Sequence, residues 1–228
     1  MSKQNTAVVV LAAGLGTRMK SVIPKVLHPI AGRAMILQLL DSLTDIDPDQ
    51  IVLVLGPGME SVSDAVASAG YSFEIVIQKD RLGTGHAVQQ TEKILSDFKG
   101  DILVLYGDTP LIRSKTLVKM LDARKMSINP AVVVLGFRPF DPARYGRLII
   151  NSSGNLDAIV EAADANEDEL SNDLCNSGVM LIDNTILFNL VSDLSNDNEK
   201  GEFYLTDIIR LSGQNGRHCI VVEGEEEE

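Results

Sequence analysis

Apolar runs of strand length recur through the first 137 residues of the chain, at 7–12, 51–56, 73–78, 102–106 and 131–137. They are rich in Val, Ile and Leu, and they lack the polar alternation of a half-exposed strand. This pattern predicts strands that are buried on both faces of a sheet.

Segments with helical spacing separate these runs, at 34–43, 59–69, 84–95 and 115–125. In the third segment, Ala87, Ile94 and Leu95 form an apolar stripe. Strands that alternate with helices in this way predict an α/β fold, a mostly parallel, Rossmann-like sheet with helices on both faces.

After Pro142 the predicted elements no longer alternate regularly between strand and helix. Strand-like pieces at 147–151, 156–161 and 176–182 precede helical segments at 185–194 and 205–212 and a strand-like run at 218–222. Because no linker separates the two parts, we expect a single domain over residues 1–228. It would have a first lobe (1–140), a second lobe (141–222) and an acidic tail (223–228).

Open parallel sheets bind ligands at the carboxyl ends of their strands, where the strand order reverses. The residues directly after three of the predicted strands are Ala13-Gly14, Gln78 and Gly107-Asp108. Glycine or polar groups at these places predict the location of a binding site before any motif is considered.

Composition limits the classes of function. Of the 228 residues, 45% are apolar and 23% charged, as in globular proteins. No apolar run reaches the roughly 18 residues of a membrane helix, and the short polar N-terminus does not resemble a signal peptide, so we expect a cytoplasmic protein. The net charge of −12 argues against nucleic-acid polymers as partners. A phosphate site in so acidic a chain must gather its cations locally or use a metal ion.

Cysteine and histidine give no sign of a metal centre. Cys175 and Cys219, like His28, His86 and His218, show no metal-ligand spacing. We expect the cysteines to be reduced and structural. No Ser/His/Asp or Cys/His arrangement is recognisable, so we expect no covalent intermediate.

The most informative motif follows the first predicted strand and reads Leu11-Ala-Ala-Gly-Leu-Gly-Thr-Arg-Met19, then Pro24-Lys25. Small residues and glycines allow backbone N–H groups to approach an anion closely. Arg18 and Lys25 add positive charge suited to phosphates. The run lacks the third glycine of the dinucleotide fingerprint and the Gly-Lys-Ser/Thr of a Walker loop. It therefore predicts a different kind of nucleoside triphosphate loop.

Three further segments follow this motif: Gln78 with Leu82-Gly-Thr-Gly-His-Ala87, then Leu105-Tyr-Gly-Asp-Thr-Pro-Leu111, then Gly201-Glu-Phe-Tyr-Leu-Thr-Asp207. Together they resemble the sugar nucleotidyltransferases, the pyrophosphorylase family. Within it they are most similar to the uridyltransferase domain of the bacterial bifunctional uridyltransferase/acetyltransferases. The likeness extends from about residue 7 to residue 222.

This resemblance implies the nucleotidyltransferase fold and a Mg²⁺-dependent reaction of UTP with N-acetylglucosamine 1-phosphate. The products would be pyrophosphate and UDP-N-acetylglucosamine, a precursor of peptidoglycan and lipopolysaccharide. The first lobe would bind the nucleotide and the second the sugar. Arg18 and Lys25 would be catalytic, on the pyrophosphate and on the incoming phosphate. The substrate-binding residues would be Leu11, Ala12, Ala13, Gly14, Lys25, Gln78, Gly83, Thr84, Tyr106, Gly107, Asp108, Gly146, Glu161 and Asn176.

Side-chain chemistry agrees with several of these implied roles. The Gln78 amide can both donate to and accept from the edge of uracil, with Gly83 and Thr84 completing the base pocket. The Asp108 carboxylate offers the hard oxygen ligand that Mg²⁺ prefers. Glu161 and Asn176 offer polar partners to a sugar. Simpler interpretations are a helix cap or turn residue for Asp108, a surface charge for Glu161 and a turn residue for Asn176.

Two family features would lie beyond Glu228. They are an asparagine that is the second metal ligand and the β-helix that carries the acetyltransferase, to which the family's homotrimers are attributed. We therefore expect a fragment of such a protein, without acetyl transfer. Three alternatives are a sugar-nucleotide binding fragment with little activity, a nucleotidyltransferase for another sugar or base (such as a thymidylyltransferase) and a glycosyltransferase. The last lacks its expected Asp-x-Asp pair.

Overall fold

The computed structural model describes residues 5–14, 16 and 19–225. Its sheet strands are β1 (Thr6–Leu11), β4 (Gln50–Leu55), β5 (Glu74–Ile77), β6 (Asp101–Tyr106), β7 (Val132–Phe137), β8 (Arg147–Ile150), β9 (Leu156–Val160), β10 (Cys175–Asp183) and β11 (Cys219–Glu223). Within the described residues they form one sheet in the order β11-β7-β10-β6-β1-β4-β5, with β8 paired to β10 and β9 to β8.

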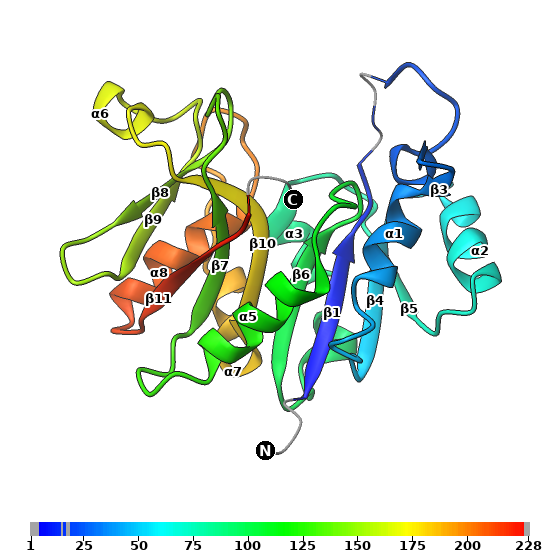
Figure 1. Ribbon diagram of the computed structural model, residues 1–228, viewed down its shortest axis with the longest axis horizontal. Helices are drawn as coiled ribbons and strands as arrows, with labels where there is room; N and C mark the ends of the chain where they lie inside the picture. Colours follow the sequence, from blue (N-terminus) through cyan, green and yellow to red (C-terminus); the bar gives the residue numbers. More distant parts are fainter. Residues whose placement is uncertain (1–4, 15, 17–18, 226–228) are drawn as a thin grey trace.

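The sheet is mostly parallel, as the sequence predicts. β5, β4, β1 and β6 run parallel to one another, and β11 runs parallel to β7. β10 interrupts this run, since it is antiparallel to both β6 and β7, and the side strands β8 and β9 are also paired antiparallel. The chain leaves β1 for β4 on one side and later returns to β6 on the other, so the strand order reverses beside β1 (Figure 1).

Helices cover both faces of the sheet (Figure 1). On one face lie α1 (Met35–Asp41), α2 (Glu60–Ser68) and α5 (Ser114–Arg124), packed on Val8 and Val10 of β1. On the other lie α3 (Thr84–Gln89), α4 (Glu92–Leu95), α7 (Asn184–Ser192) and α8 (Ile208–Gln214), packed on Val9 and Leu11. The alternation of side chains along a strand explains why β1 is buried at every position and apolar from Ala7 to Leu11.

Two predictions about these elements are wrong. The run at 73–78 was expected to be buried on both faces, but β5 is the edge strand, and Ile75 and Ile77 are 42% and 43% exposed. The segment 84–95 was expected to be one helix, but α3 and α4 are separate. The hydroxyl of Thr91 donates to the Val88 carbonyl at 2.7 Å, a local bond that competes with the regular helix.

Four short elements have no counterpart in the sequence prediction. Among the described residues, they are the 3₁₀ turn η2 (Lys25–Leu27), the hairpin strands β2 (Pro29–Ile30) and β3 (Arg33–Ala34), and α6 (Glu167–Leu170). The predicted helical segment at 205–212 begins with the 3₁₀ turn η3 (Leu205–Asp207) and continues as α8. A signal existed for α6, because Asn166 and Glu169 form a capping box. No helix in the described ranges is long and apolar enough to cross a lipid bilayer.

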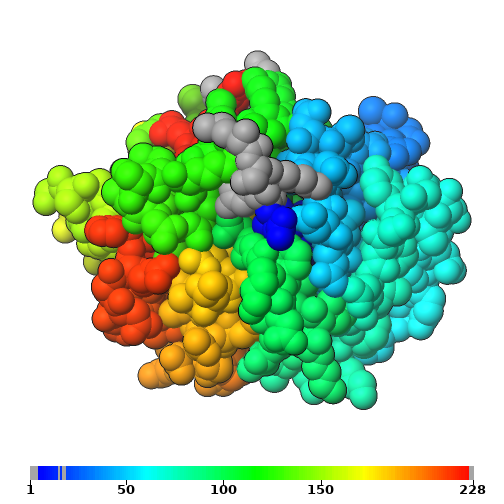
Figure 2. All heavy atoms as spheres, turned by 90° about the horizontal axis from the view of Figure 1, so that it is seen from below, coloured from blue at the N-terminus to red at the C-terminus, as the bar shows by residue number. Residues whose placement is uncertain are grey.

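The amino ends of the central strands meet on the face seen in Figure 2. There the start of β1 lies between the segment before β4 and the segment before β6. The Asn5 carbonyl accepts from the Asp101 N–H at 3.0 Å, and the Thr6 carbonyl accepts from the Asp49 N–H at 2.9 Å. Asp101 also pairs with Asp183 across β6 and β10, so both carboxylates lie at this end of the sheet, away from the carboxyl ends of the parallel strands.

Candidate functional site

A cavity of about 230 Å³ opens at the carboxyl ends of β1, β5 and β6. It lies where the strand order reverses, which is the position at which open α/β sheets bind ligands. Many of the predicted substrate-binding residues line it: Leu11, Ala12, Ala13, Gly14, Lys25, Gln78, Gly83, Thr84, Tyr106 and Asp108.

Lys25 and Asp108 form an ion pair at this cavity. Their side chains are 39% and 30% exposed, so the pair is accessible from solvent. The N-cap of α5 is Arg113, which excludes the interpretation of Asp108 as a helix cap. Asp108 lies instead in a turn, directly after β6. A cation and a carboxylate side by side supply the two charges needed to bind a phosphate and a divalent cation.

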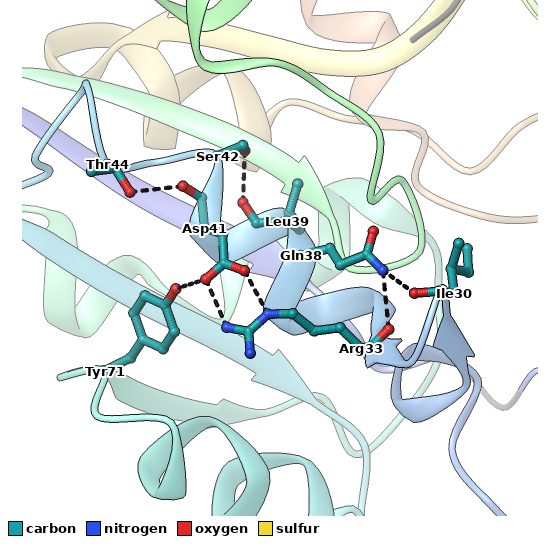
Figure 3. A network of polar contacts seen from close by, with 8 residues as sticks. All are labelled: Ile30, Arg33, Gln38, Leu39, Asp41, Ser42, Thr44 and Tyr71. Atoms are coloured by element: carbon teal, nitrogen blue, oxygen red, sulfur yellow. Dashed lines mark hydrogen bonds and ion pairs between the residues drawn. The ribbon is translucent and has the colours of Figure 1, made fainter.

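The hairpin that follows η2 is fixed to α1 by side chains (Figure 3). The Gln38 amide donates to the carbonyls of Ile30 and Arg33. Asp41, at the end of α1, accepts from two guanidinium nitrogens of Arg33, at 2.5 and 2.7 Å, and from the Tyr71 hydroxyl. The Arg33 guanidinium lowers the pKa of Asp41, while burial and the Asp41 carboxylate raise the pKa of Tyr71 to about 12. These contacts hold the segment after η2 on the first lobe.

Gln78 is only 4% exposed and follows directly on β5. Its Nε2 lies 3.0 Å from the Gly83 carbonyl oxygen and 3.1 Å from Nδ1 of His86. Because a carbonyl only accepts, the NH₂ group of Gln78 must face Gly83. Its Oε1 has no hydrogen-bond partner in the described part of the chain, so Gln78 offers a ligand an acceptor.

The Gly83-Thr84-Gly85 run packs against the segment before η3. An ideal Cβ on Gly83 would lie 2.6 Å from the Phe203 carbonyl oxygen. The Phe203 carbonyl accepts from the Gly85 N–H at 2.8 Å, and the Thr84 hydroxyl accepts from the Leu205 N–H at 3.0 Å. The motif therefore also joins the cavity wall to the second lobe, which the sequence analysis did not foresee.

Replacing Gly83 by alanine is expected to lower the free energy of unfolding by about 2–4 kcal/mol, because a clash adds to backbone strain. Gly83 has φ +108° and ψ 178°, a region nearly restricted to glycine. Gly154 is the control, since it has φ +84° but nothing within 4 Å of its ideal Cβ, and Gly154→Ala should cost about 1–2 kcal/mol. Urea denaturation measures both, and equal losses would exclude the Phe203 contact as the reason for glycine.

Tyr106 connects the cavity to the predicted sugar-binding residues. Its ring packs on Gly178, where an ideal Cβ would lie 2.6 Å from the ring. Asn176 accepts from the Gly178 N–H at 2.9 Å through Oδ1, and its own N–H donates to the Gly146 carbonyl at 2.8 Å. Gly146 and Asn176 are thus brought together, and Asn176 is linked through Gly178 to the Tyr106 ring, although among the described residues Gly146 and Asn176 are not in the lining of the 230 Å³ cavity.

Glu161 lies in a second cavity, of about 770 Å³, together with Arg144 and Lys200. Burial raises its pKa and Lys200 opposes the rise, which does not fit an ordinary surface charge. Burial also raises the pKa of Tyr106 to about 12, and the charges of Glu161 and Asp108 add to it while Thr84 opposes it.

Besides Gly146, Asn176 and Glu161, one further predicted residue that the structure describes is not in the lining of the 230 Å³ cavity. Gly107 is not part of its lining within the described chain, because it packs inward: an ideal Cβ would lie 2.9 Å from the Val26 side chain. Arg18, the other predicted catalytic residue, lies outside the described residues.

Sequence reasoning missed two charged residues of the cavity, Arg81 and Glu202. Arg81 donates from Nε to the Ala13 carbonyl at 2.8 Å, and it directly precedes the Leu82-Gly-Thr-Gly run, a signal that could have identified it. The buried hydroxyls of Tyr204 and Thr206 were also missed, and neither has a partner among the described residues.

The remaining sequence predictions concern cysteines, metals and the tail. Cys175 and Cys219 are buried and free, as expected. Among the described residues, no group of three or more His, Cys, Asp or Glu is placed to hold a metal ion. Glu225 accepts from Arg113 at 2.8 Å and from Lys115 at 2.6 Å, so the acidic segment is placed as far as that residue.

The family profile described as "MobA-like NTP transferase domain" matches residues 8–168. The chain belongs to this family. The matched range of this NTP transferase includes Lys25, Gln78 and Asp108, and thus the charged part of the cavity.

Curated relatives of the NTP transferase carry the name "Bifunctional protein GlmU". The chain is 54% identical over 228 residues to that of Paramagnetospirillum magneticum, which covers 100% of this chain and 50% of the relative. It is 55% identical over 223 residues to that of Rhodospirillum rubrum, covering 98% and 49%. The chain therefore spans about half the length of the curated relatives it matches.

Solved structures show the same fold at low identity. A UDP-glucose pyrophosphorylase complexed with UDP-glucose matches with a TM-score of 0.76 and 19% identity, over 97% of this chain and 92% of that one. A putative glucose-1-phosphate thymidylyltransferase from Bacillus anthracis, in complex with a sucrose, matches with a TM-score of 0.78 and 22% identity, over 96% and 87%. The prediction of a nucleotidyltransferase fold is confirmed.

Proposed function

We propose that this NTP transferase moves a uridylyl group from UTP to N-acetylglucosamine 1-phosphate and releases pyrophosphate. The observation that carries the proposal is the cavity at the strand ends, where the glycine-rich segment after β1 meets the Lys25–Asp108 pair. The identity of 54% over the whole chain to a GlmU protein supports the choice of substrates.

The first lobe binds the nucleotide in this proposal. Backbone N–H groups of residues 11–14 hold phosphate oxygens, as small residues after a buried strand allow. The Oε1 of Gln78 accepts from the N3–H of uracil, and Gly83 and Thr84 complete the base pocket. This assignment is supported by the lining of the 230 Å³ cavity, which includes residues 11–14, Gln78, Gly83 and Thr84.

The carboxylate oxygens of Asp108 are suitable ligands for a magnesium ion. Mg²⁺ takes only one or two carboxylates and completes its shell with water and phosphate oxygens. The Asp108 carboxylate is hard, partly exposed and placed in the cavity, so one protein ligand is sufficient for a substrate-bound ion. When bound, the ion would neutralise charge on the phosphates and hold them in one geometry.

The chemistry requires positioning more than a base. A phosphate oxygen of the sugar phosphate forms a bond to the α-phosphorus of UTP, and the bond to the β-phosphate oxygen breaks, so that pyrophosphate leaves with the electron pair. Such transfers depend on alignment and on neutralising charge. Lys25 holds the incoming phosphate, and Arg18 is assigned to the departing pyrophosphate. No covalent intermediate is required.

The second lobe binds the sugar in the same proposal. Asn176 is hydrogen-bonded to Gly146 and to Gly178, on which the Tyr106 ring packs, and Glu161 lies in a separate cavity. A sugar that carries hydroxyl and acetamido groups needs several paired donors and acceptors, which these polar groups supply. Residues 1–140 and 141–222 then act as the two lobes of one domain, and we place the reaction in the cytoplasm.

Pyrophosphate release from UTP and N-acetylglucosamine 1-phosphate tests the proposal. We expect release that needs both substrates and Mg²⁺, and little release when dTTP and glucose 1-phosphate replace them. UDP-N-acetylglucosamine should also raise the melting temperature, because a ligand stabilises the state it binds. Release with dTTP and glucose 1-phosphate only would contradict the assigned substrates. A melting shift without any release would contradict the transferase activity.

A further inference from the structure

A chain of polar side chains lies behind the Gln78 amide. His86, on α3, is half-buried and is not part of the cavity lining within the described residues. Its Nδ1 lies 3.1 Å from Gln78 Nε2, and its Nε2 lies 3.1 Å from Gln90 Nε2, which also donates to the His86 carbonyl at 3.2 Å. Within the described residues, Gln78 is the lining residue to which the His86 side chain is hydrogen-bonded.

The Gly83 carbonyl determines the orientation of the Gln78 amide. It can only accept, so Gln78 turns its NH₂ group toward it, at 3.0 Å. The same NH₂ group then donates to His86, whose Nδ1 must carry a lone pair. A neutral imidazole with an acceptor at Nδ1 has its proton on Nε2. Gln90 can accept that proton only if its amide oxygen turns toward His86, which gives up the 3.2 Å hydrogen bond from Gln90 Nε2 to the His86 carbonyl.

We propose that His86 is a positioning residue that makes the site selective for uracil over cytosine. The inference rests on the proposed function. His86 and the Gly83 carbonyl together occupy both N–H groups of Gln78, so its amide cannot rotate without losing two hydrogen bonds. Only Oε1 is then available to the base.

The orientation of this amide decides which pyrimidine fits. Uracil presents an N3–H donor between two carbonyl groups, and Oε1 accepts from that donor. Cytosine presents a lone pair at N3, which repels Oε1. A rotated amide would present NH₂ and reverse the preference, because NH₂ can donate to the N3 of cytosine. His86 thus disfavours the rotated orientation of the Gln78 amide, in which its NH₂ group would face the base.

Steady-state kinetics of wild type, His86→Phe and His86→Asn with UTP and CTP test the inference. For His86→Phe we expect KM for UTP to rise roughly tenfold and the preference for UTP over CTP to fall roughly tenfold, the size of a lost hydrogen bond. KM for the sugar phosphate should not change. His86→Asn should restore most of the preference, because its side-chain oxygen can accept near the former Nδ1 position. His218→Phe is the control, since His218 is exposed and lines only a separate cavity.

The outcomes separate the two hypotheses. Wild-type protein without UTP-dependent release of pyrophosphate would overturn both the proposed function and the role of His86. Wild-type release with an unchanged UTP/CTP preference in His86→Phe would overturn only the role of His86. A lower kcat with unchanged KM and preference would show a structural effect and also overturn it, as would a loss of preference that His86→Asn does not restore. The melting temperature of each variant is to be measured as well, because a variant that melts at the wild-type temperature cannot owe its altered kinetics to unfolding.

Discussion

Asp108→Asn is expected to lower kcat for pyrophosphate release at least about 100-fold, because nucleotidyl transfer depends on neutralising phosphate charge. The exchange keeps the shape of the side chain but removes the negative charge that a magnesium ion needs. It also leaves Lys25 without its carboxylate partner at the cavity. Initial rates at saturating UTP and N-acetylglucosamine 1-phosphate, over a range of Mg²⁺ concentrations, measure the effect.

The fold should survive this exchange. The Lys25–Asp108 pair is partly exposed, and exposed ion pairs contribute at most about 1 kcal/mol. Asp64→Asn, on the exposed side of α2, is the matched control and should leave both kcat and the melting temperature unchanged. A kcat within threefold of wild type in Asp108→Asn would exclude Asp108 as the metal ligand, whatever the melting temperature.

The pattern of apolar residues in the sequence predicts most strands of the sheet. The runs that became β1, β4, β6 and β7 are apolar at nearly every position, because helices cover both faces of these strands. The same pattern fails for β5, since an apolar run does not tell whether a strand has one neighbour or two. The division of residues 84–95 into α3 and α4 depends on the Thr91 hydroxyl, which helical spacing does not report.

The site was predictable where it depends on the ends of neighbouring strands. Gln78 and Asp108 follow β5 and β6, and parallel strands bring their carboxyl ends to one edge. Contacts between distant segments were not predictable. The pairing of Lys25 with Asp108 joins positions 83 residues apart, and the need for glycine at 83 comes from the backbone of Phe203. Neither contact can be predicted from the residues that neighbour these positions in the sequence.

A second prediction concerns the opposite end of the sheet, where Arg124 lies between two carboxylates. Its Nε lies 2.9 Å from Asp101, its Nη2 lies 2.8 Å from Asp183, and its Nη1 lies 2.5 Å from the oxygen of Asn129. All three charged side chains are nearly buried, at 9%, 5% and 11% exposed. Burial raises the pKa of Asp101 to about 6, and the Arg124 charge opposes the rise. Arg124 thus fastens the end of α5 to the start of β6 and the end of β10.

Arg124→Met should lower the free energy of unfolding by about 3–5 kcal/mol at pH 8, because it removes the guanidinium that lies between two nearly buried carboxylates, although Asp183 keeps its contact with Arg217. Loss of that charge moves the pKa of Asp101 further above its unfolded value of 3.8. A raised carboxyl pKa gives stability that is present at low pH and lost as the pH rises, so the variant should lose less at pH 5 than at pH 8. Urea denaturation at both values measures this. Lys125→Met, at an exposed pair with Asp122, should change stability by less than about 0.5 kcal/mol. A loss of stability for Arg124→Met that is equally small, or that grows toward acid pH, would show that the Arg124 guanidinium does not stabilise the buried Asp101 carboxylate.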